Sequence, residues 1–339
     1  MSQEIEIGLG KKARMAYALD DVSIVPSRRT RDSQDVSTSW QVDAYEFDVP
    51  VIGAPMDSVT SPATAIAMGR LGALGVLDLE GLWTRYDDPQ PLLDEIAQLP
   101  DDVATERIQE IYREPVKPEL ITRRLHEIRD AGVTVAGALS PQRTQQFYST
   151  VVEAGVDLFV IRGTVVSAEH VSLGHEPLNL KKFIYDLDVP VIVGGAANYT
   201  AALHLMRTGA AGVLVGFGGG AVTATRTTIG VHAPMATAIA DVAEARRDYM
   251  DESGGRYVQV IADGGMGIRA ASSRPSPWAP TPSCSALRSP APPRLPVAAS
   301  IGVRKPVTRP CHAVPAPMSA RSARWSRSCS GPATALMAR

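Results

Sequence analysis

Seven short apolar runs, each followed by a segment of helical pattern, constrain the fold of this chain most strongly. Such alternation is the signature of parallel β-α-β units. The predicted strands span residues 49–54, 73–77, 134–139, 158–161, 189–193, 212–215 and 258–262. They are continuously apolar, as expected where helices cover the outside of a sheet and packed side chains fill the inside. Seven repeats favour an α/β fold of the (β/α)8, or TIM, barrel type and leave a doubly wound open sheet as the alternative.

The repeating pattern stops after Gly267, before an eighth unit. Residues 264–339 contain 11 Lys and Arg and no acidic residue, whereas residues 1–263 contain 23 Lys and Arg and all 36 Asp and Glu. All three cysteines also lie in the later region, so neither a disulfide nor a thiolate nucleophile can form within residues 1–263. We therefore divide the chain into an incomplete barrel, 1–267, and a Pro-, Ser- and Arg-rich tail, 268–339.

The tail has two explanations, a disordered basic extension or a frameshift product. A shifted reading of synonymous codons after Gly267 accommodates the string GSLVKAIAMGADAVMLGSPLARA, which has the helix, strand and glycine turn of the missing unit. On the frameshift hypothesis, residues from about Ile268 onward do not pack as a barrel strand and helix. The first and seventh strands would then keep open edges.

Composition also limits the partners of the chain. No apolar run approaches the roughly 20 residues of a membrane span, and Glu4 and Glu6 stand where a secretory signal is basic and then apolar. The basic tail has no patterned element that could read a nucleic-acid groove. We expect a cytoplasmic protein with no membrane or nucleic-acid partner.

Four motifs stand in a characteristic order. They are ALDDVSIVP at 18–26, VIGAPMDSVT at 51–60, VLVGFGGGAVTATR at 213–226 and ADGG at 262–265. In order and spacing they resemble the IMP dehydrogenase/GMP reductase family, over residues 15–267. The resemblance implies an oxidoreductase that uses NAD or NADP on a purine nucleotide, IMP or GMP, and that commonly forms homotetramers.

The glycine-rich loop of the third motif is a candidate binding element. Gly216, Gly218, Gly219 and Gly220 can adopt positive φ and bring backbone N–H groups close to an anion. The resemblance implies that this loop approaches the nucleotide, and that Gly216 and Gly218 border a site for a monovalent cation such as potassium. Without a ligand, it would be a flexible strand-to-helix connection.

Two strand ends supply further nucleotide-binding candidates. Asp263 directly follows the seventh predicted strand, which places it at the catalytic mouth of a barrel. The resemblance implies that Asp263 holds the ribose hydroxyls and that Gly264 and Gly265 help to bind phosphate. Met56 and Asp57 follow the first strand, and the resemblance places the methionine beside the purine. The alternatives are a plain Asp-Gly-Gly turn at 263–265 and a methionine that packs in the core.

The chain departs from the family at the reacting positions. Thr223 stands where the family has the cysteine that attacks C2 of the purine to form a thioimidate, and a hydroxyl is a far poorer nucleophile without an adjacent base. Thr225 matches a family threonine that orients the reacting group. Arg162 and Gly163 follow the fourth strand, where dehydrogenases carry an aspartate facing the nicotinamide. Arg162 could bind a phosphate or carboxylate there, or form an ion pair.

Three functions remain open. They are NAD-dependent oxidation of IMP to XMP, a step of GMP biosynthesis; NADPH-dependent reduction of GMP; and purine-nucleotide binding without catalysis. The threonine at position 223 favours the third function, whereas Asp263 and its glycines fit all three. The segment from Glu80 to Trp83 and the acidic helices predicted through Arg113 stand where many dehydrogenases insert a regulatory domain. The roughly fifty residues available between the second and third predicted strands are too few for such a domain.

Overall fold

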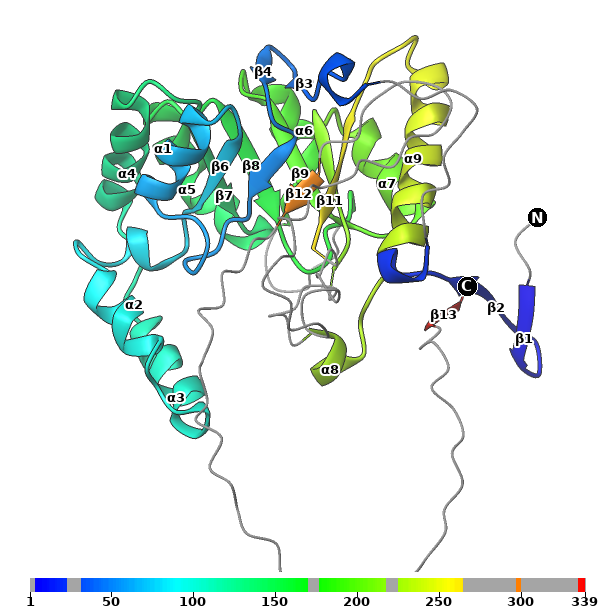
Figure 1. The fold of residues 1–339 in the computed structure, drawn as a ribbon, viewed down its shortest axis with the longest axis horizontal. Coiled ribbons are helices and arrows are strands. Elements are labelled where there is room, and N and C mark those ends of the chain that lie inside the picture. Colours follow the sequence, from blue (N-terminus) through cyan, green and yellow to red (C-terminus); the bar gives the residue numbers. More distant parts are fainter. Residues whose placement is uncertain are drawn as a thin grey trace, which may run out of the picture. The chain divides into compact units, whose positions relative to one another are not determined.

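Eight parallel strands form a closed barrel in the computed structural model, which describes residues 4–22, 32–169, 177–217, 225–264, 297–299 and 335–338 (Figure 1). In barrel order the strands are β5 (Val51–Gly53), β6 (Leu74–Asp78), β7 (Ala136–Leu139), β8 (Leu158–Arg162), β9 (Val191–Ala196), β10 (Gly212–Val215), β11 (Gln259–Asp263) and β12 (Val297–Ala299). The first seven confirm the predicted strands. Barrel closure excludes the doubly wound open sheet.

Helices cover the outside of the barrel. They are α1 (Pro62–Arg70), α4 (Pro118–Asp130), α5 (Pro141–Glu153), α6 (Leu180–Asp186), α7 (Tyr199–Arg207) and α9 (Met235–Glu252), and a short helix, α8 (Thr225–Ile229), precedes α9. Helix α1 shows why they begin and end where they do. The Ser61 side chain accepts a hydrogen bond from the Thr64 N–H at 3.1 Å, Pro62 occupies the first turn, and Gly72 at φ +76° ends the segment.

The core lies inside the barrel and is closed at the amino ends of the strands by a hairpin. Strands β3 (Trp40–Val42) and β4 (Tyr45–Phe47) are antiparallel, and Trp40 stacks on Phe47 with ring centroids 4.7 Å apart. These rings pack into the same buried cluster as Leu74 and Leu158 at the starts of β6 and β8. The hairpin thus covers the amino ends of the strands, and the carboxyl ends face away from it.

The eighth strand corrects the expectation that the tail contributes none. β12 pairs in parallel with β11 through Ala262 and Asp263 and with β5 through residues 51–53. The physical reason is that open edges present unpaired N–H and C=O groups, which an extended segment of almost any sequence can satisfy. The predicted boundary at residue 267 lies outside the described residues and stays a prediction.

A helical insertion follows β6. The 3₁₀ turn η3 (Leu82–Thr84) leads into α2 (Gln90–Ile96) and α3 (Asp101–Ile111) before α4 begins. Figure 1 shows α2 and α3 on the side of the barrel opposite the β3–β4 hairpin. Arg107 of α3 pairs with Glu95 of α2 at 2.6 Å, which ties the two helices together. The insertion is helical, as the sequence predicted.

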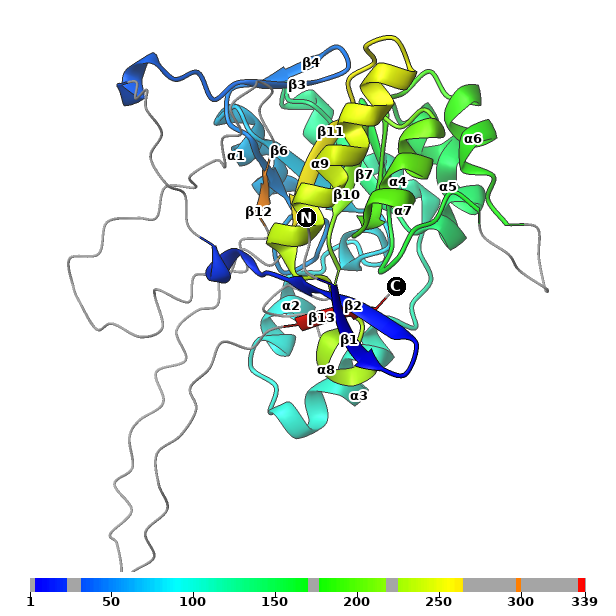
Figure 2. The same ribbon diagram turned by 90° about the vertical axis from the view of Figure 1, so that its right-hand side faces the viewer.

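A second compact unit consists of the residues up to Ala16 together with those from Val303. Its described part is an antiparallel sheet of β1 (Glu4–Gly8), β2 (Lys11–Ala16) and β13 (Ala335–Ala338), with β2 in the middle (Figure 2). The tail thus supplies a second strand that its composition did not predict.

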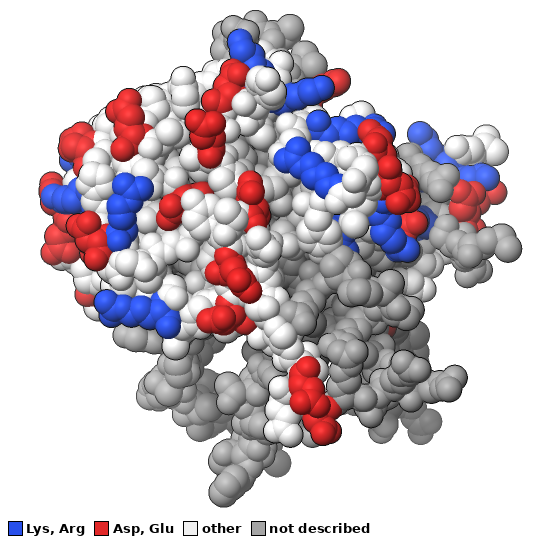
Figure 3. All heavy atoms as spheres, turned by 90° about the horizontal axis from the view of Figure 1, so that it is seen from above, with Lys and Arg blue, Asp and Glu red and all other residues white. Residues whose placement is uncertain are grey.

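Two properties of the described residues concern hydropathy and surface charge. None of the helices in the described ranges is long and apolar enough to cross a membrane. Acidic and basic side chains are interspersed over the described part of the face in Figure 3, where neither sign forms a continuous block. Mixed charge of this kind favours ion pairing over a strong field of one sign.

Candidate functional site

Three charged residues meet at the mouth of the barrel. Asp78, Arg162 and Asp263 are the last residues of β6, β8 and β11. Each stands two positions after a buried core residue, in turn Val76, Val160 and Ile261. Because strand side chains alternate between faces, the charged side chains point to the barrel interior, one layer above the core.

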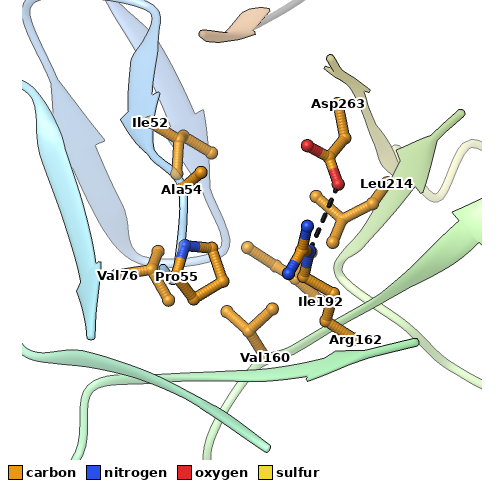
Figure 4. A pocket seen from close by; sticks show the side chains of 9 residues that line it. All are labelled: Ile52, Ala54, Pro55, Val76, Val160, Arg162, Ile192, Leu214 and Asp263. Atoms are coloured by element: carbon orange, nitrogen blue, oxygen red, sulfur yellow. Dashed lines mark hydrogen bonds and ion pairs between the residues drawn. The ribbon is translucent and has the colours of Figure 1, made fainter. Parts of the chain in front are cut away.

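A cavity opens at this layer (Figure 4). Its wall is mainly apolar, and two charged side chains lie among the lining residues. The lining consists of Ile52, Ala54, Pro55, Val76, Val160, Ile192 and Leu214 with Arg162 and Asp263. An apolar cavity with a few convergent polar groups is the usual form of a small-molecule site.

Arg162 and Asp263 form an ion pair across the cavity. Nε of Arg162 donates to Oδ2 of Asp263 at 3.4 Å, and the side chains are 32% and 17% exposed. Figure 4 shows the guanidinium extending from β8 toward the carboxylate on β11. At that length the hydrogen bond is weak, and the ion pair remains partly accessible to solvent and ligands.

Asp57 is engaged with the loop after β6. Its Oδ1 and Oδ2 accept from the Leu82 N–H at 2.9 and 3.0 Å, and the Tyr112 hydroxyl also donates to Oδ2. An added Cβ at Gly81 would collide with this carboxylate, so only glycine permits the approach. Burial raises the pKa of Asp57, while the hydrogen bonds from Tyr112 and Leu82 oppose that change. Asp57, which the sequence predicted to bind nucleotide, thus links the turn after β5 to the loop after β6 through hydrogen bonds.

Asp78 is the most strongly perturbed acid of the mouth. Burial is the main reason that its pKa rises to about 7, and the negative charge of Asp57 adds to the effect. The Glu80 N–H donates to Oδ1 of Asp78 at 2.9 Å, and this bond and the charge of Arg162 act in the opposite direction. A carboxyl group that holds its proton near neutral pH can donate or accept one during a reaction.

The glycines of the site bring three strand ends into close contact. Gly216 has φ +114° and its N–H donates to the Ala196 carbonyl at 2.7 Å. A Cβ on Gly216 would meet the Asp263 carbonyl oxygen at 2.9 Å. Gly264 has φ +78°, and Gly163 exchanges backbone hydrogen bonds of 2.9 and 3.1 Å with the 194–195 segment. The backbone N–H and C=O of Gly163 are thereby occupied, and Val166 Cγ2 lies 3.3 Å from the place that a Cβ would take, so this glycine offers little to a ligand.

Several predicted site residues lie elsewhere or cannot be placed. Gly218, Gly219, Gly220, Thr223 and Gly265 lie outside the described residues. Thr225 begins helix α8, and it is half-buried. Met56 is half-buried in the turn after β5 and is not among the residues that line the described cavity. Of the predicted set, the structure brings together Arg162, Asp263 and the glycine backbones.

Asp78 and Tyr112 were missed by sequence reasoning. Asp78 directly follows a predicted strand, the same signal that identified Asp263, and could have been found in that way. Tyr112 follows a helix of the insertion, and no local signal ties it to the mouth. Within the described ranges, no cluster of three or more His, Cys, Asp or Glu side chains is placed to hold a metal ion. The predicted potassium site would use the backbone of the glycine loop and stays a prediction.

A closed parallel barrel with charged residues at the carboxyl ends of its strands has the architecture of the (β/α)8 enzymes. Residues 16–272 match the model of the IMP dehydrogenase / GMP reductase domain. The chain belongs to this family.

Relatives agree with the assignment. An uncharacterized oxidoreductase of Mycolicibacterium smegmatis is 53% identical over 266 residues, which are 77% of this chain and 71% of the relative. The inosine-5'-monophosphate dehydrogenase of Methanocaldococcus jannaschii is 24% identical over 345 residues, 75% of this chain and 68% of that enzyme. The crystal structure of an IMP dehydrogenase/GMP reductase-like protein from Corynebacterium glutamicum superimposes with a TM-score of 0.72 at 49% identity, over 77% of this chain and 69% of that one. An oxidoreductase family and a TIM-barrel fold are therefore shown.

Proposed function

We propose that the barrel mouth binds a purine nucleoside monophosphate, IMP or GMP, and that Asp263 accepts hydrogen bonds from the ribose diol. The observation that carries this proposal is the geometry of Asp263. It ends a barrel strand, lines the cavity and, within the described residues, has one long hydrogen bond, to Arg162. A carboxylate can accept about four hydrogen bonds, so Asp263 keeps the capacity to take both hydroxyls.

The chemistry of the cavity lining suits the remaining parts of such a ligand. The apolar wall offers contact to a flat base, and Gly264, at φ +78°, has no side chain at the strand end where a phosphate would approach. We infer that Gly218, Gly219, Gly220 and Gly265 complete the phosphate contacts, as their sequence positions predict. Arg162 is the residue of the described mouth best suited to an anionic group of NAD or NADP.

Calorimetric titration of IMP and GMP into the full chain tests the binding proposal. Asp263→Ala should weaken binding by tens-fold, since it removes charge-assisted bonds worth roughly 1.5–3 kcal/mol each. A 2'-deoxynucleotide should lose affinity for the unmodified chain and little further for the variant. Asp188→Asn, which changes an exposed loop carboxylate, is the charge-matched control. Unchanged affinity in Asp263→Ala would remove Asp263 from the site.

The threonine at position 223 supports a second proposal, that the chain binds its nucleotide without the family's covalent chemistry. The full chain should then produce no NADH with IMP and consume no NADPH with GMP. IMP-dependent NADH formation above that of a heat-killed sample would make it a dehydrogenase. GMP-dependent NADPH consumption would make it a reductase. Homotetramer formation stays a prediction, and light scattering of the purified chain would test it.

A further inference from the structure

Among the described residues of the mouth, the cation Arg162 lies between the carboxylates of Asp78 and Asp263. Asp78, Arg162 and Asp263 occupy one inward-facing layer at the ends of β6, β8 and β11, as described above. Arg162 makes a hydrogen bond to Asp263, and its positive charge also acts on Asp78. One guanidinium therefore serves two acids that lie on different sides of it in the barrel.

The link from Arg162 to Asp263 can be displaced. Its single hydrogen bond is 3.4 Å long and uses one of five guanidinium donors, and a third of the Arg162 side chain is solvent-exposed. Asp263 has room for both hydroxyls of a ribose diol, but a hydroxyl bound at Oδ2 would crowd the guanidinium, whose long and weak bond to that oxygen is the easiest to break. Once displaced, the guanidinium would keep a favourable electrostatic interaction only if it moved nearer the other acid of the layer.

Asp78 is the acid that would receive it. The groups that face Asp78 are Asp57 after β5, Glu80 in its own loop, Arg162 of β8 and, through Asp57, the Tyr112 hydroxyl. Burial and the two carboxylates favour the protonated form of Asp78, whereas the hydrogen bond from the Glu80 N–H and the positive charge of Arg162 favour the ionised form. The protonation of Asp78 thus depends on how near the guanidinium lies.

We propose that Arg162 is a positioning residue shared by Asp263 and Asp78, and that a ribose diol bound at Asp263 transfers the guanidinium to Asp78, which then releases its proton to solvent. The proposal rests on the diol role of Asp263 in the proposed function. It makes nucleotide binding at the mouth a proton-coupled event. By linkage, the nucleotide binds more tightly as pH rises through the range in which Asp78 loses its proton.

The size of the coupling follows from the proton occupancy of Asp78. With a pKa of about 7 in the free protein, Asp78 is about half protonated at pH 7. An approaching cation lowers a carboxyl pKa by roughly 1–3. Binding at pH 7 should then release up to about half a proton per chain, and almost none at pH 9.

Calorimetric titration of IMP into the full chain, in two buffers of different ionisation enthalpy, measures the protons released. The phosphate of IMP also titrates near pH 6, so the quantity that counts is the difference between the unmodified chain and Asp78→Asn. We expect a difference of up to about half a proton at pH 7 that disappears at pH 9. Asp188→Asn should release as much as the unmodified chain. Equal release from the unmodified chain and Asp78→Asn would overturn the inference.

Arg162→Met tests the shared cation directly. It should bind IMP up to about fivefold more tightly at pH 6, because the diol no longer competes with an ion pair of modest strength, and it should abolish the Asp78-dependent proton release. Without ligand, it should raise the pH at which the infrared C=O band of protonated Asp78, identified by its loss in Asp78→Asn, disappears. An unchanged infrared titration would overturn the pairing. Failure of the unmodified chain to bind any purine nucleotide would instead overturn the proposed function and the inference with it. Binding without proton release would overturn the inference alone.

Discussion

Replacing Asp78 by asparagine should stabilise the protein, and more strongly as pH rises. The change keeps the size of the side chain and an oxygen that can accept from the Glu80 N–H, and it removes the ionisable group. In the folded chain the pKa of Asp78 is raised from 3.8 to about 7, chiefly by burial. The folded state therefore binds more protons than the unfolded state between about pH 4 and pH 7, and stability falls as pH rises through that window.

The magnitude follows from the width of the window. One pKa unit corresponds to about 1.36 kcal/mol, so a shift of about 3 units makes the ionised group unfavourable by at most about 4 kcal/mol above pH 7. Roughly half of this loss of folding stability occurs between about pH 4 and pH 5.5, and the other half above pH 5.5. The stability advantage of Asp78→Asn over the unmodified chain should thus grow by about 2 kcal/mol between pH 5.5 and pH 8.5.

Urea unfolding of both chains at pH 5.5, 7 and 8.5 measures this difference. The gap between their free energies of unfolding should widen over the pH series and level off above pH 8. Asp188→Asn, at an exposed position, should show no comparable widening. A gap that stayed constant, or that narrowed with rising pH, would refute the reasoning that burial holds a proton on Asp78.

Three further changes test other contacts. Gly81→Ala should lower stability by about 1–3 kcal/mol in urea unfolding, because its Cβ would collide with the Asp57 carboxylate. Gly8→Ala, whose Cβ meets nothing within 4 Å, should change stability little, and equal effects of the two substitutions would contradict the collision. Tyr112→Phe should lower stability by about 1 kcal/mol and raise the pKa of Asp57, since it removes a hydrogen bond to the Asp57 carboxylate. An unchanged NMR titration of the Asp57 carboxyl group would argue against that hydrogen bond. Ala298→Pro should lower stability by about 3 kcal/mol, because proline removes a ladder N–H from the strand that closes the barrel. An unaffected chain would contradict the pairing of β12 with β5 and β11.

Sequencing the encoding DNA around the Gly267 codon tests the frameshift hypothesis directly. An alternative frame that reads GSLVKAIAMGADAVMLGSPLARA would supply a native eighth unit, and inserting or deleting one base there should improve solubility. The three-residue β12 would then be a substitute for a longer native strand. Absence of such a frame would make the tail a genuine part of the protein.

The sequence determined the barrel because its signals are local. Each strand buries both faces, so each appears as a continuous apolar run bounded by turns, and seven runs in series admit few topologies. The position of Asp263 was predictable for the same reason, since the residue after a barrel strand lies at the mouth. Asp78 carried the same signal.

The structure decided the contacts that join distant segments. Asp57 and Tyr112 are 55 positions apart, and Arg162 and Asp263 are 101 apart, so no local pattern records either pair. Composition likewise gave no strand in the tail, yet Val297–Ala299 pairs between β11 and β5. The physical reason is that unpaired strand edges and buried charges are satisfied by whatever the closed fold places beside them. Local sequence fixes which residues form strands, and only closure of the barrel fixes which charges share its mouth.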